Sequence, residues 1–423
     1  MNYTNEPRHD ILCIDVRSFF ASVEMADRGL NQEETMLVVM SKPNLNGGLV
    51  LAASPKVKEV YGFKTGTRRF EIPNHLPIQI VEPRMRLYLQ KNQEIIEIFR
   101  RFVADDDLHI YSIDESFLDV THYTHLFGEP KVIARKIQQT VWKELKLSLT
   151  IGIGDNPLLA KLALDNQAKH SPQTNYIAYW SYESVPETIW QIGSLTDMWG
   201  IGRRTAKKLQ FLGIQSVYEL AQFDVKRLKK LHGVIGEQLF YHAHGIDQSI
   251  LSKKYIPLSR SYNKHQILDR DYIVQEEIEI VLQEMSDQVA ARLREHHVET
   301  QVVRVSVGFS DDIIDQGFSH QLTIPSTSSS KKICEVVLRI FRAHYQGQAV
   351  RSVAVHCGKI HYQTNLQFDL FEDAKKTIQE VELEKTIDQV RKKYGYSSLV
   401  HASSLSRGAT AIKRSGLVGG HQG

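Results

Sequence analysis

Two adjacent acidic residues, Asp114 and Glu115, stand between two short runs typical of β-strands. Successive side chains of a strand point to opposite faces, so this pair would place negative charge on both faces of a sheet. A third acid, Asp15, lies in the apolar run 11–16. Hard divalent cations prefer carboxylate oxygens, and two such cations between three carboxylates support phosphoryl transfer. The pattern predicts a two-metal site; the alternative is a solvated turn with an unrelated strand-end acid.

Patterns typical of strands and helices alternate over residues 1–175, which predicts an α/β layer. Helices with glycine-rich turns follow over 189–245, and a second α/β unit over 258–359. Near the C-terminus we expect one helix, 374–394, and then a Ser- and Gly-rich end that is loose. The predicted fold class is therefore multidomain α/β.

The overall composition is that of a globular protein, with 42% hydrophobic and 24% charged residues and a net charge of only +3. The three cysteines are widely spaced and form no CxxC pair, so neither a disulfide framework nor a zinc site is indicated. No apolar run approaches the roughly 20 residues that span a bilayer. We therefore expect no membrane association and a cytoplasmic location.

A glycine-rich turn followed by a basic helix occupies residues 199–214. This pattern is typical of a helix–hairpin–helix, in which the turn lets the backbone approach a phosphate and basic side chains add charge. Such contacts hold the nucleic-acid backbone and read no bases. The alternative is an ordinary helical hairpin with a solvated basic face. The candidate DNA-binding residues are Gly200, Gly202, Arg203, Arg204, Thr205 and Lys207.

Two further features suggest binding sites. Lys161, near the start of a predicted helix, could face an anion at the helix N-terminus, although a solvated lysine is the alternative. Beyond the last predicted strand, the segment 367–371 has the form of a peptide that docks into a partner's apolar pocket.

Four of these motifs, at residues 14–24, 111–116, 152–161 and around Gly200, occur in the order found in Y-family (translesion) DNA polymerases. The chain resembles that family over residues 11–406, most closely its bacterial UmuC/UvrX-like branch. The resemblance implies a right-hand polymerase with an α/β palm, small fingers, a helical thumb and an α/β little finger. Its implied divisions are a palm (1–18 and 85–176), fingers (19–84), a thumb with the helix–hairpin–helix (177–246), a linker (247–257), a little finger (258–362) and a C-terminal tail with a clamp-binding peptide (363–423).

The resemblance also implies roles for individual residues. Asp15, Asp114 and Glu115 would bind two Mg²⁺ ions, with the Val16 carbonyl as a further ligand. Phe19 and Phe20 would belong to the nucleotide-binding site, with Phe20 as the steric gate against a ribose 2′-hydroxyl. Lys161 would contact the triphosphate, and a sliding clamp would be bound by Gln367, Leu370 and Phe371.

The chain departs from the family pattern in two places. Arg17 replaces the Asp or Asn often found two places after the first metal aspartate. The Tyr and Arg that contact phosphates in many relatives are not cleanly present, and Lys56, Lys58 and Lys64 are the available cations.

The function that the resemblance implies is low-fidelity, template-directed DNA synthesis across lesions, in DNA repair and the SOS response. Primer–template DNA, dNTPs, a sliding clamp and SOS accessory proteins are the expected partners. The small residues Ala52, Ala53 and Ser54 are expected to face the nascent base pair. A nucleotide cyclase and a non-catalytic DNA-binding scaffold are the alternatives; the scaffold would leave the adjacent acids unexplained, because they repel DNA phosphates.

Overall fold

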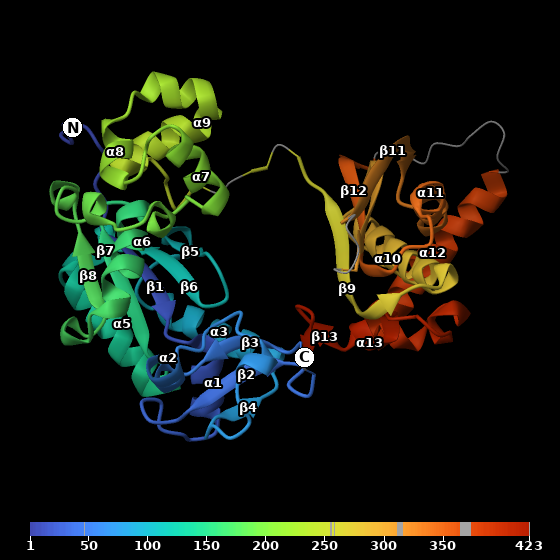
Figure 1. Ribbon diagram of the computed structural model, residues 1–423, viewed down its shortest axis with the longest axis horizontal. Coiled ribbons are helices and arrows are strands. Elements are labelled where there is room, and N and C mark those ends of the chain that lie inside the picture. The colour runs from blue at the N-terminus through green and yellow to red at the C-terminus, as the bar shows by residue number, and fades with distance from the viewer. Residues whose placement is uncertain (46, 254–255, 258, 311–315, 364–373, 423) are drawn as a thin grey trace. The chain divides into compact units, whose positions relative to one another are not determined.

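The computed structural model describes residues 1–45, 47–253, 256–257, 259–310, 316–363 and 374–422. The chain forms two compact units, Met1–Lys254 with His421–Gly423, and Tyr255–Gly420. Figure 1 shows the helices and strands of both units.

The first unit is built on a five-stranded sheet whose central strand is β1 (Ile11–Val16). Strand β1 pairs antiparallel with β6 on one side and with β7 on the other, and β8 runs parallel to β7. The order is β5-β6-β1-β7-β8, with β5 at Leu108–Ile110, β6 at Glu115–Asp119, β7 at Leu149–Gly154 and β8 at Ile177–Trp180.

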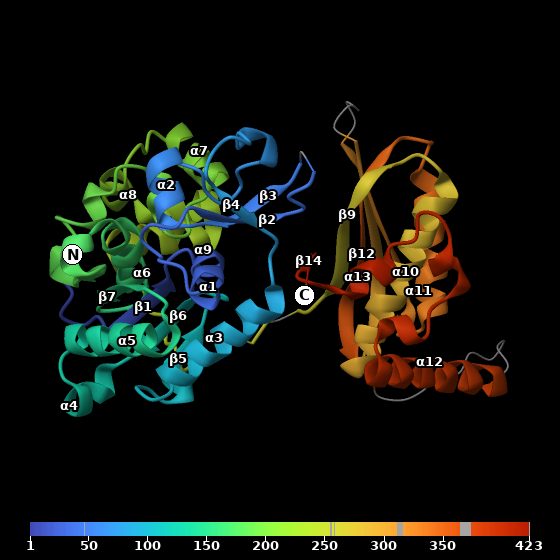
Figure 2. The ribbon, with the colours of Figure 1, turned by 90° about the horizontal axis from the view of Figure 1, so that it is seen from below.

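Helices cover both faces of this sheet. The even-numbered residues of β1 lie in one apolar cluster with α3 (Met85–Phe99) and α5 (Pro130–Leu145). Ile11 and Cys13 lie in another cluster with α6 (Pro157–Asn166). Figure 2 shows α3 and α5 on one side of β1 and β7, and α6 on the other. The alternation of a strand therefore places Asp15 on the same face as α6.

Two glycines of β7 allow α6 to lie very close to the sheet. A Cβ atom at Gly152 would be 2.0 Å from the carbonyl oxygen of Ala160, and one at Gly154 would be 2.4 Å from the amide nitrogen of the same residue. Any larger residue would push the helix away. The Gly-Ile-Gly sequence of β7 thus fixes how closely the helix that carries Lys161 approaches the acidic residues.

A smaller sheet and a helical region complete the first unit. The small sheet has the order β3-β2-β4, in which β2 pairs antiparallel with β3. Its elements are α1 (Phe19–Asp27), β2 (Leu37–Ser41), β3 (Leu49–Ala53), α2 (Pro55–Tyr61) and β4 (Gln79–Val81). The short helix α4 (Thr124–Phe127) precedes α5, and the helical region holds α7 (Arg203–Phe211), α8 (Val217–Gln222) and α9 (Val225–Ala243).

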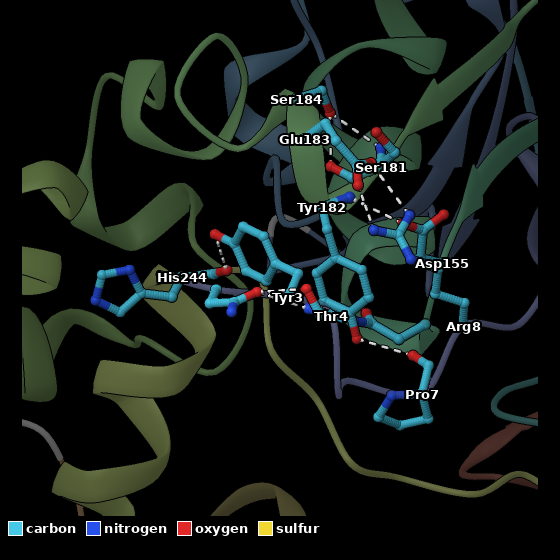
Figure 3. Close-up of polar contacts among 12 residues, drawn as sticks. Tyr3, Thr4, Pro7, Arg8, Asp155, Ser181, Tyr182, Glu183, Ser184 and His244 are labelled. Atoms are coloured by element: carbon cyan, nitrogen blue, oxygen red, sulfur yellow. Dashed lines mark hydrogen bonds and ion pairs between the residues drawn. The ribbon is translucent and has the colours of Figure 1, made fainter.

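The N-terminal segment joins the sheet to the helical region (Figure 3). The Tyr3 ring stacks on Tyr182 at a centroid distance of 5.0 Å, and its hydroxyl donates to the carbonyl of His244 at 3.0 Å. The Arg8 guanidinium pairs with Asp155 at 3.1 Å and also with Glu183. Residues near the start of the chain thus cross-link the end of β7 to the end of α9.

The second unit contains a four-stranded antiparallel sheet in the order β11-β10-β12-β9. Its strands are β9 (Tyr262–Tyr272), β10 (Val298–Phe309), β11 (Gly317–Thr327) and β12 (Val350–Tyr362), and α10 (Gln275–Glu295) and α11 (Ser330–His344) share its apolar core. The sequence predicted this second α/β unit, and its two edge strands, β9 and β11, bury few side chains.

The C-terminal region is helical as predicted over α12 (Ala374–Tyr394), but the expectation of a loose end after it is wrong. Helix α13 (Ala411–Ser415) is followed by the short strands β13 (Leu417–Val418) and β14 (His421–Gln422). The amides of Thr410 and Ala411 donate to the buried Glu284 carboxylate at 3.0 and 2.9 Å. Arg294 binds Asp388 at 2.6 Å, so α12 is held by polar contacts as well. None of the helices that the structure describes is long and apolar enough to cross a membrane.

Candidate active site

Asp15 and Glu115 face each other across two neighbouring strands. They are directly paired in the register of β1 with β6, and this places their Cβ atoms about 5 Å apart. Both lie on the face that α6 covers, because Cys13 and Phe117, two residues away on each strand, pack against that helix. The structure therefore brings together two of the three predicted acids.

Asp114 lies in a bend, and β6 begins only at the next residue. Its carbonyl accepts a hydrogen bond from the Val16 amide at 3.0 Å, which ties the bend to the end of β1. The Ser112 hydroxyl donates to the Asp114 carboxylate at 2.7 Å and accepts from the Glu115 amide at 3.1 Å. Adjacent acids are tolerated here because only the second one is in a regular strand.

Lys161 is buried against Glu115 and is not a solvated lysine. Its ammonium lies 2.7 Å from Glu115 Oε1, and the Cys13 thiol donates to the same oxygen at 3.2 Å. Burial lowers the pKa of Lys161, but the hydrogen bond to Glu115 and the charge of Asp165 outweigh it, so that the pKa is raised overall.

Two further charged residues belong to the site and were missed by sequence reasoning. The Lys169 ammonium lies 3.3 Å from Asp15 Oδ2 and 2.9 Å from Asp165 Oδ1. The other oxygen of Asp165 lies 3.0 Å from the Lys161 ammonium. The sequence does carry a signal, since Asp165 follows one lysine by four residues and precedes the other by four, the spacing of neighbours on a helix.

The carboxylates fit a divalent cation by their chemistry. Burial, and then the like charges of Asp114 and Glu115, raise the pKa of Asp15 to about 6 against the opposing effect of Lys169. A divalent cation would relieve this crowding of negative charge with the oxygen ligands that Mg²⁺ prefers. Among the described residues, no three Asp, Glu, His or Cys side chains are arranged so that they could hold a metal ion as they stand.

The candidate gate residue Phe20 lies at the start of α1, shortly after Asp15 in the sequence. Its ring stacks on Tyr88 at a centroid distance of 4.4 Å, and the Tyr88 hydroxyl donates to Glu24 at 2.8 Å. Burial would raise the pKa of Glu24, but hydrogen bonds from Arg84, Tyr88 and an arginine one turn away lower it overall. The Phe20 ring is thus supported by a tyrosine that a buried carboxylate holds in place, while Phe19 is in the core.

Of the three candidate lysines, only Lys58 is directed towards the site. Its ammonium donates to the Ser18 hydroxyl at 2.8 Å, and burial lowers its pKa against the opposing effect of Asp15. Lys56 pairs with Glu59 on the surface at 3.1 Å.

The structure also shows the surroundings of Lys64, Ala53, Ser54 and Arg17. The side chain of Lys64 is exposed. Ala53 and Ser54 are fully buried, and the Ser54 hydroxyl caps α2, so the expectation that these two face a base pair is wrong. The Arg17 guanidinium lies 3.8 Å from the centre of the Tyr176 ring and makes a cation–π contact with it.

The predicted hairpin has the expected geometry. Gly200 has a φ of +92°, which favours glycine, and Gly202 is the N-cap of α7. Buried Ile201 and Leu209 anchor the turn and the helix. A cavity of about 700 Å³ separates this turn from the end of α6. The basic side chains of Arg203, Arg204 and Lys207 are exposed, and Thr205 is half-buried. The predicted clamp-binding residues Gln367, Leu370 and Phe371 lie outside the described residues.

Comparisons with known proteins agree with this arrangement. The impB/mucB/samB family matches residues 14–165, its C-terminal domain matches 259–370, and the IMS family HHH motif matches 182–214. The chain belongs to this family, the Y-family of DNA polymerases, which confirms the predicted right-hand fold class and DNA-directed DNA polymerase activity in translesion synthesis. Enzymes of this family depend on metal ions and act on DNA, so the cyclase and scaffold alternatives are set aside.

Among individual proteins, the chain is 41% identical to the "Putative UV-damage repair protein UvrX" of Bacillus subtilis (strain 168), over an alignment of 424 positions that covers 100% of both chains. It is 32% identical to "DNA polymerase IV 2" of the same organism, over 97% of this chain and 98% of the relative. A solved structure, "Y-family DNA polymerase chimera Dbh-Dpo4(243-245)-Dbh", matches 84% of this chain and 99% of its own with a TM-score of 0.66 at 20% identity.

Proposed function

We propose that this polymerase adds dNTPs to a primer 3′-hydroxyl with two Mg²⁺ ions held by Asp15, Asp114, Glu115 and the Val16 carbonyl. The observation that carries this proposal is the direct pairing of Asp15 with Glu115 across β1 and β6, with Asp114 in the bend tied to Val16. Bound metal ions would supply the Lewis acidity that activates the hydroxyl and neutralises the pyrophosphate leaving group.

The protein's own part is to position and to neutralise charge. Lys161, which is buried against Glu115, and Lys58, whose ammonium donates to the Ser18 hydroxyl, are the candidates for binding the triphosphate. Phe20, supported by Tyr88, would occupy the space next to the sugar and exclude a ribose 2′-hydroxyl. No side chain needs to act as a dedicated general base in this scheme.

The exposed basic face of α7 and the Gly200–Gly202 turn suit contacts to the DNA backbone. Such contacts are independent of sequence, as synthesis on any template requires. Binding to a sliding clamp through 367–371, SOS accessory proteins, and work in the cytoplasm of a damaged cell remain predictions that follow from the family.

Primer extension with an Asp114→Asn variant tests the metal assignment. Extension with Mg²⁺ should fall by at least about a thousandfold, because one of the anionic ligands is lost, while DNA affinity measured by fluorescence anisotropy stays within about twofold. Asp106→Asn removes an exposed acid outside the site and should extend primers like the wild type. Near-normal extension by Asp114→Asn would refute the metal site, and equal loss by both variants would point to a general charge effect.

A further inference from the structure

Five charged side chains form a continuous chain of alternating sign across the site. It runs from Asp15 to Lys169 (3.3 Å), Asp165 (2.9 Å), Lys161 (3.0 Å) and Glu115 (2.7 Å). The two outer acids are the proposed metal ligands, and the central one is not. Each ammonium is therefore shared between Asp165 and one metal ligand.

This sharing has an electrostatic consequence. An ammonium that had a metal ligand as its sole anionic partner would hold that carboxylate strongly in a buried site and oppose the binding of a cation there. Asp165 offers both lysines a second carboxylate. We infer that Asp165 is a positioning residue which, by holding Lys161 and Lys169, keeps Glu115 and Asp15 available to a divalent cation. The inference rests on the proposed function and adds a residue that the family resemblance did not assign.

The position of Asp165 on α6 makes this role specific. The four-residue spacing places it between the two lysines, and the close contact of α6 with Gly152 and Gly154 fixes the helix above the strands. The carboxylate of Asp165 is one-third exposed, and it lines the cavity beside the hairpin turn together with Asp197. Asp197 is an exposed acid of the same cavity and provides a matched control for the loss of one negative charge.

Mn²⁺ binding to the full-length protein without DNA or nucleotide, with free Mn²⁺ counted by electron paramagnetic resonance, tests the inference without any turnover. Asp165→Asn should weaken Mn²⁺ binding about tenfold, whereas Asp197→Asn should stay within about twofold of the wild type. The double variant Asp165→Asn/Lys169→Met should recover part of the loss, because the ammonium that would pair only with Asp15 is gone while Lys161 still pairs with Glu115. A merely structural role of Asp165 would not produce this recovery.

Wild-type Mn²⁺ binding by a folded Asp165→Asn variant, or equal losses in Asp165→Asn and Asp197→Asn, would overturn the inference. If Asp165→Asn does not fold, Lys169→Met alone decides: it should tighten Mn²⁺ binding several-fold, and unchanged or weaker binding counts against the inference. Failure here leaves the proposed function intact, since that depends separately on the loss of primer extension in Asp114→Asn.

Discussion

Replacing Asp15 by Asn should inactivate the enzyme and yet stabilise its fold. Burial and the neighbouring acids raise the pKa of Asp15 to about 6, from 3.8. A carboxyl group whose pKa is higher in the folded than in the unfolded state makes its full contribution to stability at pH values below its unfolded-state pKa. This contribution is lost as the pH rises through the folded-state pKa, here about 6. At 1.36 kcal/mol per pKa unit, the charged Asp15 costs about 3 kcal/mol at pH 8, about 1.6 kcal/mol at pH 5 and about 0.6 kcal/mol at pH 4.

The assay is urea denaturation in EDTA at these pH values, followed by intrinsic fluorescence. Asp15→Asn should exceed the wild type in free energy of unfolding by up to about 3 kcal/mol at pH 8, and the gain should shrink as the pH falls. Asp106→Asn, in which an exposed acid is changed, should show no such gain. Destabilisation by Asp15→Asn at pH 8, or a gain that is independent of pH, would refute the reasoning.

Three other predictions follow from particular contacts. Phe20→Ala should admit ribonucleotides at least about tenfold more readily in single-nucleotide incorporation assays, because the ring braced by Tyr88 is removed; unchanged discrimination would place the gate elsewhere. Gly152→Ala should lower the free energy of unfolding by about 3 kcal/mol or more, since its Cβ would overlap the α6 backbone, whereas Gly193→Ala, with open space around it, should change little; similar losses in both would contradict this account. Arg294→Ala should release α12 and make residues 374–416 sensitive to limited proteolysis, at a cost of about 3 kcal/mol, and persistent protection would show that other contacts suffice.

Much of the first unit could be predicted from the sequence because its elements carry strong local signals. The apolar run of β1 coincides with the strand, and the Gly200–Gly202 turn has the geometry that its glycines favour. The three acids were recognisable as a candidate metal site, but the sequence could not show that Asp114 lies in a bend. That feature depends on a hydrogen bond from Ser112, which a pattern of strand formers does not reveal.

The rest depends on contacts between residues far apart in the chain. The edge strand β11 has few buried side chains, so it lacks the alternation that marks a half-buried strand. The docking of the C-terminal end relies on the buried Glu284, more than a hundred residues earlier, which binds the amides of Thr410 and Ala411. The partners of Lys169 could have been suspected from helical spacing, but its contact with Asp15 required the close approach of α6 to β7.

The N-terminal segment has a consequence for how the chain folds as it is synthesised. Tyr3 leaves the ribosome well before its hydrogen-bond partner, because the carbonyl it binds belongs to His244, 241 positions later. At roughly 5–20 residues per second, about 10 to 50 s separate the two events. During that interval β1 can pair with β6 and β7, and Arg8 can pair with Asp155, while the Tyr3 hydroxyl still lacks its carbonyl partner. The hydrogen bond that ties Tyr3 to the end of α9 can therefore form only after the helical region has been made, and a ribosome that stalls before residue 244 would carry the sheet without this tether.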